Sequence, residues 1–137
     1  MDNGFIIGNG IAFSPDDTRM YFADSRDETV WVYDFDIATG SISNRREFFS
    51  TLTIEGRVDG AACDTNGNYW CALVHPTMVA FGGPDRTDLY VTSATAMLDE
   101  SERGDWRDAG KVFRITGHGA QGLPEPVFDH DFTGKTG

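Results

Sequence analysis

A segment of the chain is repeated three times, and one position of the repeat always holds a side chain with an oxygen atom that could bind a ligand. Asn9, Asp59 and Thr77 each stand before a short apolar run, a turn rich in Asp, Gly or Pro, and a second apolar run. In a repeat protein, equivalent positions can direct several ligands to one place. Amide and carboxylate oxygens are hard ligands that suit Ca²⁺, Mg²⁺ or Mn²⁺, and with water they also serve Zn²⁺ or Fe²⁺. The repeated position is therefore a clue to function.

Each of these residues also has a simpler explanation. Asn9 lies in the sequence Gly-Asn-Gly and Asp59 precedes Gly60, so both could serve turns instead of binding an ion. Thr77 could line the same site, but a hydroxyl at the end of a strand more often bonds to the backbone. From the residues alone, a structural role is favoured at all three positions.

Two other acidic segments are interpreted as structural. The segment DTNGN at residues 64–68 resembles a calcium loop, but its glycine comes too early for an EF-hand and no glutamate closes it. A hairpin turn is therefore predicted there. A second acidic cluster is expected to be a solvated rim, and its members are Asp16, Asp17, Asp24, Asp27 and Glu28.

Composition restricts the possible partners. The 137 residues are 39% hydrophobic and 24% charged, which is typical of a folded domain. A net charge of -11 opposes binding to nucleic acid or anionic lipid, and no apolar run is long enough to predict a membrane span. Cys63 and Cys71 lie in apolar segments and are expected to be buried thiols, so a reducing compartment, the cytoplasm, is predicted.

The elements that must position these residues are strands. Alternating apolar residues and turn signals predict an all-β chain, and the segment from residue 11 to residue 52 has the size of one antiparallel propeller blade. A charged insertion at 97–109 could contain a helical turn. Strands are expected at residues 11–13, 20–23, 29–35, 46–52, 60–63, 69–74, 78–81, 89–92, 112–115 and 127–129.

The spacing of the repeats is uneven. Asn9 and Asp59 are 50 residues apart, whereas Asp59 and Thr77 are only 18 apart. A four-stranded blade needs about 40 to 50 residues, so the middle unit lacks the sequence for its two outer strands. Residues are therefore either deleted or omitted between Val74 and His75.

Several long segments resemble one family. YDFDIATGSISNRR at 33–46 and FGGPDRTDLYVTSA at 81–94 are the most specific, and GNGIAFSPDDTRMYFADS, VDGAACDTNGNYWCAL and GKVFRITGHGAQGLPEPVF support them. The chain is similar to the second half of SMP-30/gluconolactonase proteins, also called regucalcin-like. This resemblance implies a six-bladed β-propeller, of which residues 1–137 would form about half a ring, with roughly three blades and a truncated middle one.

The resemblance also implies a function. Many family members are metal-dependent lactonases that act on sugar lactones, with one cation held by Glu, Asn and Asp. By motif, Asn9 and Asp59 correspond to two of these ligands, and Asp59 would also be the general base; Val58 stands where the family usually has proline. The family glutamate lies in the half that has no counterpart here, so self-association or pairing with an N-terminal half would be needed. The alternative is a catalytically incomplete scaffold that binds a cation or a partner.

Overall fold

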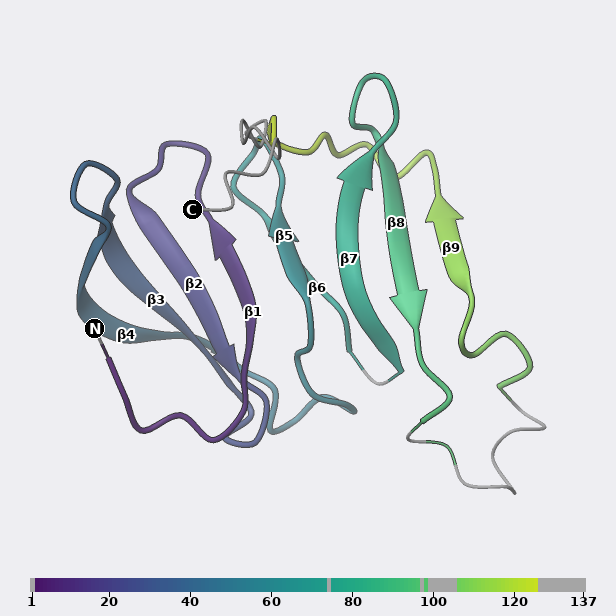
Figure 1. Ribbon diagram of the computed structural model, residues 1–137, viewed down its shortest axis with the longest axis horizontal. Coiled ribbons are helices and arrows are strands. Elements are labelled where there is room, and N and C mark those ends of the chain that lie inside the picture. Colours follow the sequence, from purple (N-terminus) through teal and green to yellow (C-terminus); the bar gives the residue numbers. More distant parts are fainter. Residues whose placement is uncertain (1, 74, 97, 99–105, 126–137) are drawn as a thin grey trace, which may run out of the picture.

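The computed structural model describes residues 2–73, 75–96, 98 and 106–125 (Figure 1). Within these residues every regular element is a β-strand, and the strands form three antiparallel sheets that stand side by side. The all-β prediction is confirmed. The strands are β1 (Gly8–Phe13), β2 (Arg19–Asp24), β3 (Thr29–Asp36), β4 (Ser41–Ser50), β5 (Ala61–Cys63), β6 (Tyr69–Cys71), β7 (Pro76–Gly82), β8 (Asp88–Ser93) and β9 (Val112–Ile115).

The first sheet has the order β1-β2-β3-β4, as expected for a blade of consecutive hairpins. Strand β4 begins at Ser41, five residues before the predicted start. The cause is the tight turn after β3, in which Gly40 takes a positive φ of 68° and its N–H donates to Asp36 O at 2.8 Å. Ser41 therefore pairs directly with Asp36, and the ladder starts at once.

The second sheet contains only β5 and β6 among the described residues. The buried carboxylate of Asp64 closes their hairpin, because it accepts hydrogen bonds from the backbone N–H groups of Asn66 and Asn68, both at 2.9 Å. It also accepts from the side chains of Asn68 at 2.8 Å and Trp70 at 3.0 Å. The predicted hairpin turn at residues 64–68 is thus confirmed.

The third sheet has the order β7-β8-β9. Arg114 on β9 pairs with Asp88 at the start of β8, with 2.8 Å between Nη2 and Oδ2. Every residue of β9 is exposed, so this strand is the open edge of the described sheet. The strand expected at 127–129 and most of the insertion at 97–109 lie outside the described residues.

Small apolar clusters join the sheets. Strand β1 lies beside β5, and β5 lies beside β7. One cluster, built around Ala12, Tyr21 and Cys63, packs the first sheet on the second, and another, around Ala72 and Val79, packs the second on the third. We call β1, β5 and β7 the inner strands, because they are the ones that meet.

Two expectations about buried side chains need correction. Asp24 is only 2% exposed and is not part of a solvated rim, since its carboxylate accepts hydrogen bonds from the backbone N–H groups of Ile6 at 2.7 Å and Ile7 at 3.2 Å, with further bonds from the turn that follows β2. Cys63 is buried at 6% exposure, as expected, but Cys71 is only half-buried.

Candidate metal site at the mouth of the inner strands

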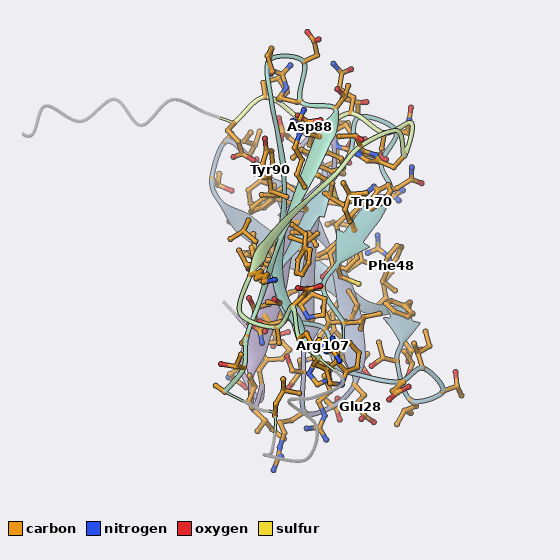
Figure 2. All side chains as sticks on the ribbon, turned by 90° about the vertical axis from the view of Figure 1, so that its right-hand side faces the viewer. Glu28, Phe48, Trp70, Asp88, Tyr90 and Arg107 are labelled. Carbon is orange, nitrogen blue, oxygen red and sulfur yellow. The ribbon has the colours of Figure 1, made fainter. Side chains whose placement is uncertain are left out.

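Asn9, Asp59 and Thr77 all lie at the N-terminal ends of the inner strands, which we call the mouth. Asn9 is the second residue of β1, Asp59 comes two residues before β5, and Thr77 is the second residue of β7. Figure 1 shows that β1 and β7 start at the same end of the molecule. In Figure 2 this end, where the mouth lies, is at the bottom near Glu28, and Asp88 marks the opposite end at the top.

A glycine follows Asn9 and another follows Asp59, and each lets the neighbouring segment approach closely. A Cβ on Gly10 would collide with the hydroxyl of Tyr69 and would lie 2.9 Å from Val58 Cγ1. A Cβ on Gly60 would lie 2.8 Å from Met78 Cα and 2.9 Å from Thr77 O. The sequences Asn-Gly and Asp-Gly therefore reflect close packing between neighbouring sheets at the mouth.

Neither Asn9 nor Asp59 serves a turn. Asn9 pairs with Ala23 within the first sheet, next to a bulge where Gly10 takes a positive φ of 55°. The N–H of Asp59 donates to Ala72 O at 3.0 Å and so extends the pairing of β5 with β6. Bulges commonly redirect a side chain next to a functional site. The turn explanation for these two residues is wrong.

The side chain of Asn9 is held by Ser25. Its Nδ2 donates to Ser25 Oγ at 2.8 Å, and that hydroxyl donates to Val58 O at 2.5 Å. Since Nδ2 is the donor, Asn9 keeps Oδ1 as a free acceptor within the described structure. Ser25 was not identified from the sequence as a site residue, although it ends the repeated segment and Ser93 stands the same 16 residues after Thr77.

The carboxylate of Asp59 is half-buried. Within the described residues it has no hydrogen-bond donor or cationic partner, and burial alone raises its pKa above 3.8. A partly desolvated carboxylate of this kind is stabilised by a bound cation and also suits proton transfer.

Thr77 is placed differently from the prediction. Its hydroxyl bonds to the hydroxyl of Thr92 on β8, with 2.8 Å between the oxygens, and not to the backbone. Thr77 therefore lies at the mouth, but its hydroxyl is already bonded to the neighbouring strand.

Among the described residues there is no group of three or more His, Cys, Asp or Glu side chains that could hold a metal. Two oxygen donors, one neutral and one anionic, fit part of a divalent-cation shell.

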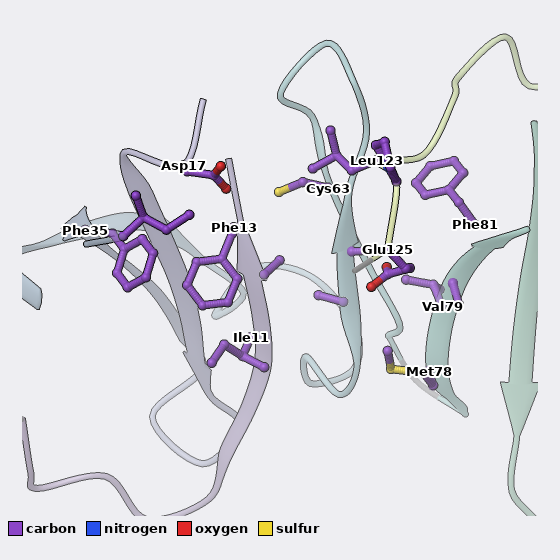
Figure 3. Close-up of a pocket in the computed structure, with 16 residues that line it drawn as sticks. Ile11, Phe13, Asp17, Phe35, Cys63, Met78, Val79, Phe81, Leu123 and Glu125 are labelled. Carbon is purple, nitrogen blue, oxygen red and sulfur yellow. The ribbon is translucent and has the colours of Figure 1, made fainter. Parts of the chain in front are cut away.

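A separate cavity lies along the inner strands. Its volume is about 520 Å³, and Asn9, Asp59 and Thr77 are not among its lining residues (Figure 3). Phe13 and Phe35 face it from the first sheet, and Leu123 and Val79 face it from the other side, with Asp17 and Glu125 as its charged groups. The lining of this cavity is mainly apolar.

Comparison with known proteins gives the family. The sequence model of the SMP-30/Gluconolactonase/LRE-like region matches residues 1–75, more than half of the chain. The chain belongs to this family. The match ends at His75, next to the position where the repeat spacing predicts missing residues.

Family relatives match over most of this chain. Regucalcin of Danio rerio is 33% identical over 142 residues, which covers 86% of this chain and 48% of the relative. The 6-deoxy-6-sulfogluconolactonase of Pseudomonas putida is 34% identical over 153 residues, covering 93% and 52%. The crystal structure of a calcium-binding regucalcin from Agrobacterium tumefaciens has a TM-score of 0.80 at 29% identity, covering 89% and 49%.

The lengths of these alignments are informative. The chain spans about half the length of the curated relatives it matches. Alignments of 142 and 153 residues exceed the 137 residues of the whole chain, so these SMP-30/gluconolactonase relatives contain residues that face gaps here. The two-stranded middle sheet is where the described structure has the fewest strands. No helix in the described part of the chain is long and apolar enough to cross a membrane.

Proposed function

We propose that the chain is the metal-binding part of a sugar lactonase, in which Asn9 and Asp59 hold one divalent cation and Asp59 is also the general base. One observation carries this proposal. The Ser25 hydroxyl bonds both to the Asn9 amide and to the carbonyl of Val58, the residue before Asp59, and within the described residues neither Asn9 Oδ1 nor the Asp59 carboxylate is used by another group. Relatives that are named as a lactonase and as a calcium-binding protein support the proposal.

The residues of the mouth would divide the chemistry. The amide of Asn9 is tied to Ser25 through Nδ2 and offers Oδ1 as a neutral ligand. Asp59 would be the anionic ligand of the cation and would take the proton of the attacking water. A bound Ca²⁺, Mg²⁺, Mn²⁺, Zn²⁺ or Fe²⁺ would polarise the lactone carbonyl.

The architecture proposed for residues 1–137 is part of one six-bladed ring. The four-stranded sheet would be a full blade, the β5-β6 sheet a truncated one, and the β7-β8-β9 sheet a third. A further acidic ligand would come from outside residues 1–137, from a second copy of the chain or from an N-terminal half. The apolar cavity along the inner strands and the exposed strand β9 support such an association.

The alternative is a scaffold that binds a cation or a partner without turning over substrate. The described residues provide two oxygen donors at the mouth and no cluster of three acidic, His or Cys ligands. A binding role needs no further ligand and no general base.

A lactone assay separates these functions. Hydrolysis of glucono-1,5-lactone would be followed with a pH indicator, with and without Ca²⁺, Mn²⁺ or Zn²⁺, for the chain and for Asp59→Asn. Asp85→Asn is the matched control, because it removes the same charge from an exposed turn at the opposite end of β7. We expect activity that depends on the metal, is lost in Asp59→Asn and is kept in Asp85→Asn.

Two other outcomes of this assay would change the assignment. Calcium binding without hydrolysis, lost in Asp59→Asn, would favour the scaffold. Hydrolysis that survives in Asp59→Asn would reject Asp59 as the general base.

A further inference from the structure

Ser25 is fixed in place by the segment that surrounds it. It follows β2 directly, is 7% exposed, and its N–H donates to Ile7 O at 3.0 Å. The neighbouring carboxylate of Asp24 accepts hydrogen bonds from the N–H groups of Ile7 and Arg26, at 3.2 and 3.0 Å, which holds both sides of this turn. The Ser25 hydroxyl therefore has little freedom to move away from the mouth.

The two hydrogen bonds of Ser25 have a definite direction. A serine hydroxyl has one hydrogen, and Val58 O can only accept, so this hydrogen goes to Val58. Towards Asn9 the hydroxyl must then accept, which makes Nδ2 the donor. The orientation of the Asn9 amide follows, with Oδ1 turned away from Ser25.

The same hydroxyl links two sheets. Asn9 belongs to the first sheet and Ser25 to the turn that follows β2, whereas Val58 belongs to the segment that leads into β5. Val58 is 2% exposed and packs with Ala23 and Val30, so its carbonyl cannot reach water easily. Because Asp59 is the next residue, a shift at Val58 O moves the carboxylate as well.

We propose that Ser25 is a positioning residue, whose single hydroxyl orients Asn9 Oδ1 and sets the place of Asp59, so that the two oxygens converge on one divalent cation. This inference rests on the proposed function for its ligand and goes beyond it in the residue it assigns. Residues that orient metal ligands typically change metal affinity by about 10- to 100-fold when they are replaced.

The first test measures Ca²⁺ and Mn²⁺ affinity by titration calorimetry. Ser25→Ala removes both hydrogen bonds, Ser25→Thr keeps the hydroxyl, and Ser93→Ala is the matched control. Ser93 is the equivalent residue of the third sheet, at the end of β8, where its hydroxyl donates to Lys111 O at 3.0 Å. We expect about 10- to 100-fold weaker binding for Ser25→Ala, and near wild-type binding for Ser25→Thr and Ser93→Ala. Equal affinity of wild type and Ser25→Ala would overturn the inference.

The second test does not depend on a cation. NMR would follow hydrogen exchange of the Asn9 side-chain amide, whose donor is bonded to Ser25 in the wild type. We expect slow exchange in wild type and Ser93→Ala and at least tenfold faster exchange in Ser25→Ala. Unchanged exchange in Ser25→Ala would refute the role of Ser25. If the wild type binds no cation but exchange still rises in Ser25→Ala, the proposed function fails while the positioning of Asn9 stands.

Discussion

Replacing Gly10 with alanine tests the close approach of strands at the mouth. Gly10 has a positive φ of 55°, and an alanine there would be strained by about 1–2 kcal/mol. Its new Cβ would also meet the Tyr69 hydroxyl, Val58 Cγ1 at 2.9 Å and Ala23 Cβ at 3.1 Å. Overpacking of this kind costs about 1–3 kcal/mol.

A hydrogen bond is lost in the same substitution. Tyr69 Oη donates to Gly10 O at 2.6 Å, and displacing the ring removes a bond worth about 1 kcal/mol. Together these effects predict a loss of about 3–6 kcal/mol in the free energy of unfolding. A loss of this size is a large fraction of the stability of a typical domain.

Gly40→Ala is the control for backbone strain alone. Gly40 also has a positive φ, of 68°, but a Cβ there would meet nothing within 4 Å. We expect a loss of only about 1–2 kcal/mol for Gly40→Ala. Urea unfolding followed by tryptophan fluorescence measures both variants, and equal losses would refute the claim that close packing requires Gly10.

A double-mutant cycle sharpens this test. Tyr69→Phe removes the hydroxyl that the new Cβ of Gly10→Ala would meet. The double variant should therefore be more stable than the sum of the single losses predicts, by about 1–3 kcal/mol. Strict additivity would show that the two groups do not collide.

Three further predictions concern carboxylates and assembly. The pKa of Asp59 is raised by burial, so its contribution favours folding below pH 3.8 and is lost as the pH rises through its folded pKa. Asp59→Asn should accordingly raise the melting temperature at pH 7, with the gain vanishing below pH 3.8, and a lower melting temperature at pH 7 would contradict this. Burial opposes ionisation of Asp64, but its hydrogen bonds from Asn68, Trp70 and the backbone outweigh burial and hold its pKa below 3.8. The stabilisation from Asp64 should be present above pH 3.8 and fall away in more acidic solution. Asp64→Ala should lower the free energy of unfolding in urea at pH 7 by about 3–5 kcal/mol, because it leaves buried donors unpaired. A loss under about 1 kcal/mol would count against those hydrogen bonds. Size-exclusion chromatography with light scattering should show self-association that grows with concentration, whereas a monomer at every concentration would argue against completion of the site by a second copy.

Local patterns in the sequence determined the strands and their turns. Apolar alternation in TVWVYDF and the turn sequences DIATG and DTNGN are properties of neighbouring residues. Strand β3 and the hairpins that contain these two turns could therefore be predicted. The repeat also predicted that Asn9 and Asp59 would be equivalent, and the structure places both at the mouth. Their role as metal ligands stays a prediction.

Only the tertiary structure decided how the mouth is held together. Ser25 and Val58 are 33 residues apart, and Tyr69 and Gly10 are 59 apart, so their hydrogen bonds exist only because the first sheet packs on the second. Asp24 has the sequence context of a solvated rim, yet it is buried by the chain before β1. Strand formation depends on local side-chain alternation, whereas the neighbours of a polar side chain depend on how the sheets meet, and one sequence read locally does not contain that information.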